Sequence, residues 1–233
     1  MIRHRMTNAG RRWKWFMDSD HGLAALLFFL VLYTFIIYPL LGGESMTGGA
    51  VSIFFSLILV AGIIATSTHH AVRVGIVILA VVALASHWLN VILGGRVDHM
   101  VSAGAAVAFF SVQAWFLSVR VFGDGAVNAY RILGAVAVYL VLGLLWANAY
   151  LFLYLASPTT FQFAPGTQAY EPPVSEMVYF SFVTLTTLGF GDITAVHPFA
   201  RSLVMLEGLV GQLYPAIVLA RLVTQYRGRG ERP

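Results

Sequence analysis

Long apolar runs separated by short polar segments dominate the pattern of hydrophobic and polar positions along this chain. A helix that crosses the roughly 30 Å hydrocarbon core of a bilayer needs about 17–25 mostly apolar residues. The pattern therefore predicts an all-α integral membrane protein with six transmembrane helices. The predicted spans are Leu23–Leu41, Ala50–Thr66, Val74–Leu93, Val101–Val119, Ile132–Leu155 and Phe199–Val223.

The segment between the fifth and sixth runs contains a further apolar stretch that is too short to span a membrane. The loop Ser157–Glu171 is polar and rich in turn residues, and the prolines Pro172 and Pro173 can open a helix. The stretch Val174–Thr186 that follows has only about 13 residues. Non-helical backbone at membrane depth is tolerated only where protein surrounds it or where it lines a water-filled cavity. We therefore expect a re-entrant helix followed by a loop that lines such a cavity.

Composition and charge agree with a bilayer location. Hydrophobic residues make up 59% of the chain and charged residues only 10%, too few to cover a soluble globule. Alternating the six spans places Arg96 and Arg201 on one side and all other basic residues on the opposite side, which the positive-inside rule identifies as the cytoplasm. We expect a multi-pass protein of the plasma (cell inner) membrane with both termini cytoplasmic, whose positive charge faces membrane lipids rather than nucleic acid. The cytoplasmic basic residues would be Arg3, Arg5, Arg11, Arg12, Lys14, Arg73, Arg120, Arg131, Arg221, Arg227, Arg229 and Arg232.

The residues that follow the predicted short helix carry a motif. Residues 184–192 read T-L-T-T-L-G-F-G-D, which resembles the potassium channel pore signature T-x-T-T-V-G-Y-G-D. A filter strand must turn successive carbonyl oxygens toward one axis, which requires unusual backbone angles at alternate residues. Glycine adopts such angles at little steric cost, which accounts for Gly189 and Gly191. The resemblance is specific at residues 184–192 and extends loosely over residues 126–223.

This resemblance implies a function and an assembly. It implies one subunit of a homotetrameric potassium-selective channel, with K+ as the permeant ion and no cofactor. The implied filter residues are Thr187, Leu188, Gly189, Phe190 and Gly191, with K+ sites at the first four. Support for the filter is expected from Asp192, Tyr179, Phe180, Thr184, Thr186 and Glu207. The cavity and gate are expected at Gly208, Gly211, Gln212, Pro215 and Leu219.

The hydrophobic pattern, with a turn at Gly123-Asp124-Gly125 after the fourth span, also predicts a division of the chain into four parts. Residues 1–22 would be a basic cytoplasmic segment, and residues 23–122 a peripheral domain of four transmembrane helices. The pore domain, with outer helix, pore helix, filter and inner helix, would occupy residues 126–225, and residues 226–233 would be a short cytoplasmic tail. The predicted fourth span, Val101–Val119, contains no arginine, so we expect weak or absent voltage dependence.

Two departures from the commonest family pattern concern the bracing of the filter. Leu188 and Phe190 replace valine and tyrosine, and Val183 stands where some relatives have a buried glutamate. Phe190 has no hydroxyl with which to bond the surrounding aromatic residues. Our hypothesis is that Tyr179 holds Asp192 instead, and that the loosely braced filter inactivates more readily than a fully braced one.

The last predicted span contains an acidic residue, two glycines and a proline. If Gln212 faces the cavity, then Glu207 points about 140° away at 100° per residue, which favours a bracing role behind the filter over a ring of charges in the pore. Gly211 and Pro215 predict a bend or hinge there. The alternative is that Gly208 and Gly211 only permit close helix packing.

Other functions compete with a potassium channel. A nonselective cation channel would differ in its reversal potential in mixed Na+ and K+. Related uptake transporters carry four such loops per chain, whereas this chain has one. An intramembrane enzyme needs paired reactive side chains within its spans, and only Glu207 is clearly available, so we expect no enzyme. A metal site at His69 and His70 is disfavoured because adjacent residues do not share a helical face.

Overall fold

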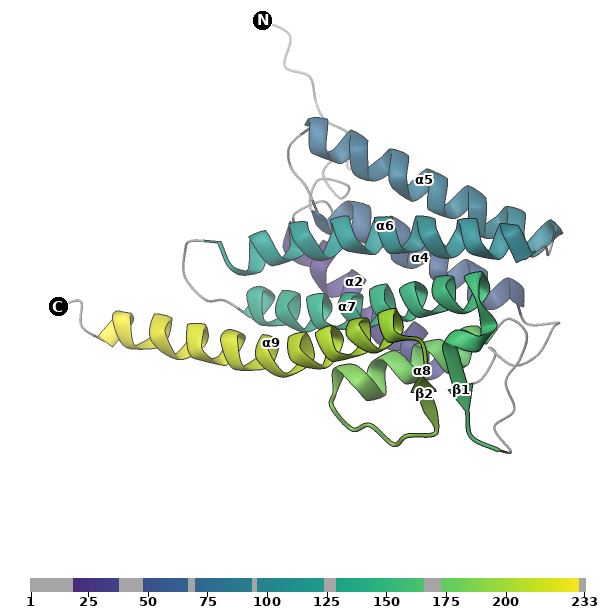
Figure 1. Ribbon diagram of the computed structural model, residues 1–233. Coiled ribbons are helices and arrows are strands. Elements are labelled where there is room, and N and C mark those ends of the chain that lie inside the picture. The colour runs from purple at the N-terminus through teal and green to yellow at the C-terminus, as the bar shows by residue number, and fades with distance from the viewer. Residues whose placement is uncertain are drawn as a thin grey trace, which may run out of the picture.

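The computed structural model describes residues 19–37, 48–66, 70–93, 96–123, 129–165 and 173–230, and these are mainly helical (Figure 1). The predicted N-terminal segment lies outside the described residues up to residue 18, as does the end of the predicted tail from residue 231. The elements are α2 (Ser19–Leu32), the π-helix η1 (Tyr33–Ile37), α4 (Gly48–Thr66), α5 (His70–Leu93), α6 (Arg96–Val121), α7 (Ala129–Ala156), the 3-10 helix η2 (Pro158–Thr160), β1 (Phe161–Phe163), α8 (Val174–Leu185), β2 (Ile193–Ala195) and α9 (Pro198–Gly230).

Each of the six predicted spans is helical over its described part. Within the described residues, three helices are long and apolar enough to cross a membrane: Asp98–Val121, Tyr130–Ala156 and Pro198–Arg221. The described apolar helices at Gly22–Ile37, Ser52–Ala65 and Val74–Leu89 are shorter. The structure thus has a mainly helical fold with three candidate spans, and the full set of six crossings stays a prediction.

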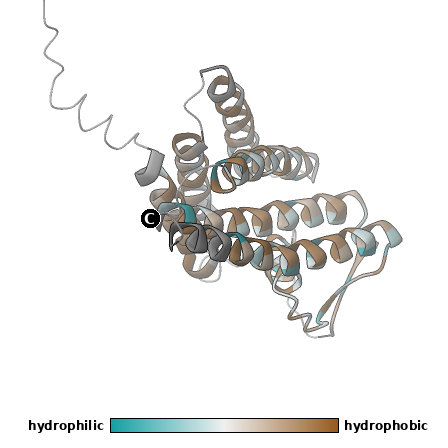
Figure 2. Cartoon of the chain, turned by 90° about the vertical axis from the view of Figure 1, so that its left-hand side faces the viewer, coloured by the Kyte–Doolittle hydropathy of each residue, from teal (hydrophilic) through white to brown (hydrophobic). Residues whose placement is uncertain are grey.

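The helices pack through an apolar interior. α7 lies against α6, α2 and α8, while α4 packs between α2 and α5. Figure 2 shows that hydrophobic residues extend along most of these helices. The first core has the fully buried residues Leu26, Leu30, Ile58, Leu59, Phe109, Phe110 and Leu117. A second core near α8 gathers Tyr150, Phe161, Met177 and Phe180.

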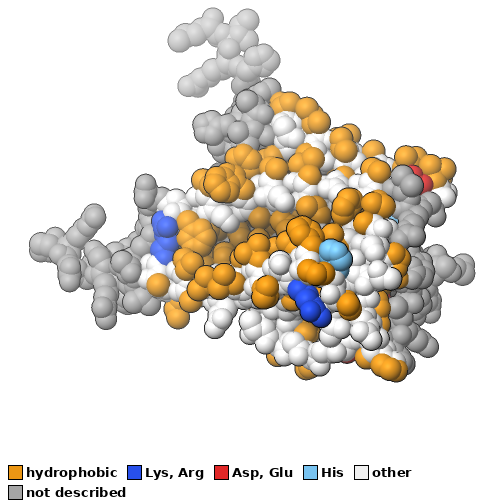
Figure 3. Space-filling model, viewed as in Figure 1, with side chains coloured by type: hydrophobic (Ala, Val, Ile, Leu, Met, Phe, Trp, Pro, Cys, Tyr) orange, Lys and Arg blue, Asp and Glu red, His pale blue; other side chains and the backbone are white. Residues whose placement is uncertain are grey.

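Many large apolar side chains are also exposed. Figure 3 shows hydrophobic side chains over much of one face of the molecule. Ile78, Ile92 and Trp115 are examples from α5 and α6, with 59%, 75% and 68% of their surface exposed. An exposed apolar surface of this extent is expected where lipid or another protein chain covers it.

Two short strands close one end of the fold. β1 and β2 pair antiparallel, with Phe161 opposite Ala195 and Phe163 opposite Ile193. β1 precedes α8 in the chain and β2 follows the loop after it, so their pairing holds the end of α7 near the start of α9 (Figure 1). The sequence pattern did not predict these strands, which are a minor addition to the expected all-helical fold.

Candidate functional site

The loop after α8 folds back on the last turn of that helix. The backbone N–H of Thr187 donates to Thr184 O at 2.9 Å, and that of Leu188 donates to Val183 O at 2.9 Å. The Thr186 hydroxyl donates to Phe182 O at 2.6 Å. The start of the motif is therefore fixed by the carbonyl groups that α8 leaves without helical partners at its C-terminus.

The backbone of this loop has left-handed angles at every second residue. The φ angles are 59° at Thr187, 56° at Gly189 and 80° at Gly191. The two glycines adopt the unusual angles expected of them, whereas the positive φ of Thr187 was not foreseen. A non-glycine residue is rarely held in this region without a constraint, because its Cβ then approaches the following carbonyl oxygen. Alternation of this kind turns neighbouring carbonyl groups away from the directions they take in a strand or helix.

Two adjacent aromatic residues of α8 point in different directions, Tyr179 being exposed and Phe180 buried. Tyr179 faces the loop, where its ring stacks on Phe190 with centroids 6.5 Å apart and planes 6° apart. The Tyr179 hydroxyl also lies near the Asp192 carboxylate, and the hypothesis that Tyr179 holds Asp192 stays a prediction. Phe180 instead packs in the second core, 5.2 Å from Tyr150 and 5.6 Å from Phe161 between ring centroids.

Within a single chain, the large side chains of the loop after α8 are mostly exposed. Leu188 is 62% exposed and Phe190 67% exposed. Gln212, Pro215 and Leu219 likewise lie on exposed parts of α9. α9 continues as one helix through Pro215, and whether it bends there stays a prediction.

Glu207 is completely buried and joins three helices. Its Oε2 atom accepts a hydrogen bond from the Tyr150 hydroxyl of α7 at 2.5 Å. Its Oε1 atom lies 2.6 Å from the Ser181 hydroxyl of α8, which is also 2.8 Å from Gly143 O of α7. This buried position is the one that bracing behind the filter requires, although the bracing role itself stays a prediction.

Proton counting indicates the state of this acid. A hydroxyl group has one hydrogen, and neither a carbonyl nor a carboxylate can donate. The Ser181 hydroxyl can therefore satisfy Gly143 O or Glu207, but not both, unless Glu207 itself carries a proton and donates to Ser181. With a protonated Glu207, all three contacts of the cluster are hydrogen bonds, so we expect the neutral acid in this arrangement.

Substitutions of Glu207 test the cluster through stability. In Glu207→Gln the amide nitrogen can donate to Ser181 while the amide oxygen accepts from Tyr150, so we expect thermal unfolding in detergent close to that of the unmodified protein. Glu207→Ala leaves the buried Tyr150 hydroxyl without this partner, which costs about 1–3 kcal/mol, while the Ser181 hydroxyl still donates to Gly143 O. A lowered unfolding temperature for the alanine variant alone is the expected result. Equal destabilisation by glutamine would show that the cluster needs an ionised carboxylate.

The two glycines of α9 differ in their surroundings. A Cβ atom at Gly211 would lie 1.9 Å from Leu185 O at the end of α8, whereas one at Gly208 would meet nothing within 4 Å. The packing interpretation therefore fits Gly211 but finds no support at Gly208 within one chain. Leu185 O also accepts a hydrogen bond from the Tyr139 hydroxyl at 2.9 Å.

Sequence reasoning missed the partners of Glu207 and of Leu185. Ser181, Tyr150 and Tyr139 are polar groups within otherwise apolar helices, and such groups need partners inside a membrane. The presence of these polar residues in apolar helices was visible in the sequence, but only the packing of the helices shows which polar groups bond to one another. No cluster of three or more metal-ligating side chains occurs among the described residues; His69 and the side chain of His70 lie outside them.

Known proteins are similar to this part of the chain. A protein family described as "Ion channel" matches residues 139–227. "Two pore potassium channel c" of Oryza sativa subsp. japonica is 40% identical over 84 residues, which cover 33% of this chain and 18% of that relative. The chain thus aligns with less than a fifth of the relative's length. The residues matched by the family, 139–227, include α8, the motif loop and most of α9. Residues 139–227 are thus similar to the ion channel family, and 84 residues of the chain are similar to a potassium channel.

Proposed function

We propose that this chain is one subunit of a homotetrameric channel that conducts K+ passively and selectively across a membrane. The observation that carries the proposal is the alternating left-handed backbone at Thr187, Gly189 and Gly191, directly after the short helix α8. In this proposal, the carbonyl oxygens of residues 187–191 replace the hydration shell of K+.

Four copies are needed because the sequence contains one such motif. A ring of carbonyl groups requires several strands around one axis, and a single loop presents only one. The exposed apolar side chains of Leu188 and Phe190 fit an assembly in which other subunits cover them. Other subunits would also cover α9, whose apolar membrane-length part is only 11% buried within the chain. Each α8 then directs its negative C-terminal end toward the cavity, which favours a cation there.

The remaining parts of the chain take places consistent with this pore. α7 is the outer helix, α8 the re-entrant pore helix and α9 the inner helix, and the preceding helices complete six crossings of the plasma membrane. Both termini lie in the cytoplasm, in keeping with the distribution of basic residues. Without arginines in its predicted fourth span, the channel responds weakly or not at all to voltage.

Reconstitution tests this function directly. We expect the purified chain to migrate as a tetramer and to carry K+ through liposome membranes under a K+ gradient. In mixed Na+ and K+ solutions, the reversal potential should follow the K+ gradient. A reversal potential that follows neither ion would indicate a nonselective cation channel, and an absence of flux from tetrameric protein would contradict the proposal.

The substitution Phe190→Tyr tests the bracing of the filter. The added hydroxyl offers a further hydrogen bond near Tyr179, and one such bond contributes about 0.5–1.5 kcal/mol. We expect inactivation of the K+ current to slow by roughly two- to tenfold. The control is Phe199→Tyr at the exposed start of α9, which should leave the decay unchanged. An unchanged decay in Phe190→Tyr itself would count against the hypothesis of weak bracing.

A further inference from the structure

The backbone carbonyl groups at the C-terminus of α8 each have a hydrogen-bond partner. The last four carbonyl oxygens of an α-helix have no partner within the helix, and in α8 they belong to residues 182–185. Thr186, Leu188 and Thr187 of the following loop donate backbone N–H bonds to the first three, at 3.0, 2.9 and 2.9 Å in that order. The fourth oxygen, that of Leu185, takes its bond from outside the loop.

The partner of Leu185 O is Tyr139 of α7, whose hydroxyl donates to it at 2.9 Å. Leu185 is completely buried in the chain, and a Cβ atom at Gly211 of α9 would lie 1.9 Å from the same oxygen. The carbonyl therefore lies where α7, α8 and α9 meet. A buried carbonyl without a partner costs about as much free energy as a lost hydrogen bond, so the Tyr139 hydroxyl fixes the direction in which this carbonyl points.

The carbonyl held by Tyr139 belongs to the peptide group that leads into the motif. This group also contains the N–H of Thr186, and because a peptide group is planar, the carbonyl and the N–H can only rotate together. The next residue is Thr187, whose φ is 59°. A threonine is rarely held in this region without a constraint. Tyr139 thus supplies, from another helix, a constraint one residue before the strained backbone of Thr187.

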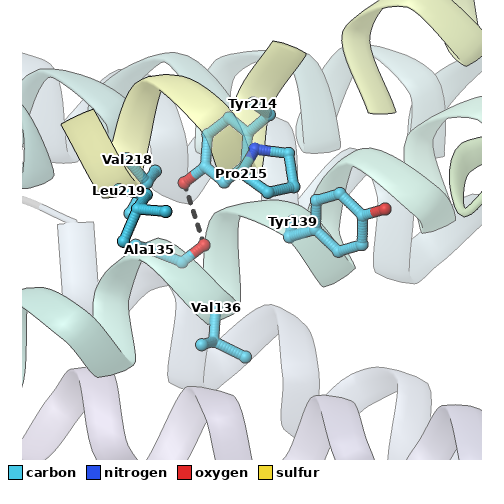
Figure 4. A pocket seen from close by; sticks show the side chains of 7 residues that line it. All are labelled: Ala135, Val136, Tyr139, Tyr214, Pro215, Val218 and Leu219. Carbon is cyan, nitrogen blue, oxygen red and sulfur yellow. Dashed lines mark hydrogen bonds between the residues drawn. The ribbon is translucent and has the colours of Figure 1, made fainter. Parts of the chain in front are cut away.

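Tyr139 is itself held beside α9. Its ring lies 5.9 Å from that of Tyr214 between centroids, with the planes 31° apart. Figure 4 shows the two tyrosines between α7 and α9 with their hydroxyl groups pointing away from each other. The Tyr214 hydroxyl donates to Ala135 O of α7 at 2.9 Å. Ala135 O lies inside a helix and also accepts from the backbone N–H four residues later, so it keeps a partner when the Tyr214 hydroxyl is removed.

We infer that Tyr139 is a positioning residue for the filter, whose hydroxyl orients the Leu185 carbonyl and so keeps Thr187 in the conformation that binds K+. The inference rests on the proposed function, because it requires K+ sites at residues 187–190. Without the hydroxyl, the peptide group after Leu185 is free to rotate, and Thr187 can relax to a negative φ. The carbonyl oxygens next to Thr187 would then leave their positions at the proposed K+ sites.

Thermal unfolding of the purified full-length protein over a series of K+ concentrations, with Na+ replacing K+, tests this inference. A ligand that binds the folded state stabilises it by an amount that depends on its concentration relative to Kd. We expect Tyr139→Phe to weaken K+ binding about two- to tenfold, the effect of one hydrogen bond. The matched control is Tyr214→Phe, which removes a hydroxyl bond of the same length between α9 and α7 and should leave the K+ dependence unchanged.

A merely structural role of Tyr139 predicts a different result. The unfolding temperature would then fall by a similar amount at every K+ concentration, as expected for Ile58→Val, which removes a methyl group from a buried position in α4. Replacing Tyr139 with p-aminophenylalanine keeps a hydrogen-bond donor at the end of the ring and should restore most of the K+ affinity.

The possible failures of this experiment can be told apart. An unchanged K+ dependence in Tyr139→Phe would overturn the inference and leave the proposed function intact. A failure of this variant to form tetramers would also overturn it, because the hydroxyl would then serve the fold rather than the filter. An absence of stabilisation by K+ in the unmodified protein would contradict the proposed filter and the inference together.

Discussion

Replacing Gly189 with alanine is expected to abolish selective K+ flux while leaving the protein folded. Gly189 has a φ of 56° and open space around the position that a Cβ would take. The substitution therefore causes no clash with neighbours, and its effect comes from the backbone alone. An L-residue in this left-handed conformation costs roughly 1–2 kcal/mol, and in a tetramer this strain occurs in every subunit.

The strain is relieved if the loop changes to a negative φ at this residue. Such a change rotates the adjoining peptide groups and removes their carbonyl oxygens from the proposed K+ sites. We expect K+ flux into liposomes to fall by more than about tenfold, with thermal unfolding and tetramer mass unchanged. Gly75→Ala in α5 is the matched control, because its Cβ also meets nothing within 4 Å and its φ is ordinary for a helix. Normal selectivity in Gly189→Ala would argue against a filter at residues 187–191.

Replacing Gly211 with alanine is expected to have a larger effect on the folded structure. The new Cβ would lie 1.9 Å from Leu185 O and 2.7 Å from Leu185 C, both backbone atoms at the end of α8. Neither α8 nor α9 can yield by moving a flexible side chain. The helices must separate, and the cost should exceed the roughly 1–3 kcal/mol of ordinary overpacking in a core.

Separation of α8 and α9 also disturbs their neighbours. Tyr139 of α7 donates to the same Leu185 oxygen, and the Glu207 cluster joins α9 to α8 one turn away. We expect Gly211→Ala to yield little tetramer in size-exclusion chromatography and to unfold at a clearly lower temperature. Gly208→Ala serves as the matched control on the same helix, since nothing lies within 4 Å of its Cβ position in the chain. A stable Gly211→Ala tetramer with altered opening would instead favour a hinge at this position.

The alternation of apolar and polar segments by itself determined most of the secondary structure. The six apolar runs and the short helix at Val174–Leu185 are all helical in their described parts. Burial of apolar side chains and hydrogen bonding of the backbone are properties of each segment, so they can be inferred from composition and length. The backbone angles of Gly189 and Gly191 in the motif at residues 184–192 could also be inferred from the sequence, because glycine adopts left-handed angles at little cost. The positive φ of Thr187 could not be inferred in this way, since threonine does not favour it.

Only the tertiary structure decided which helices meet and what their polar groups do. The sequence marked Glu207 as unusual, but not that Tyr150 and Ser181 would be its partners, because these residues are separated by 57 and 26 positions. It offered a hinge or close packing at Gly211, and only the approach of Leu185 O distinguishes Gly211 from Gly208. The apolar pattern also did not predict the strands β1 and β2, since each has only three residues and forms by pairing with the other. Contacts between distant segments depend on packing geometry, which no local pattern of residues specifies.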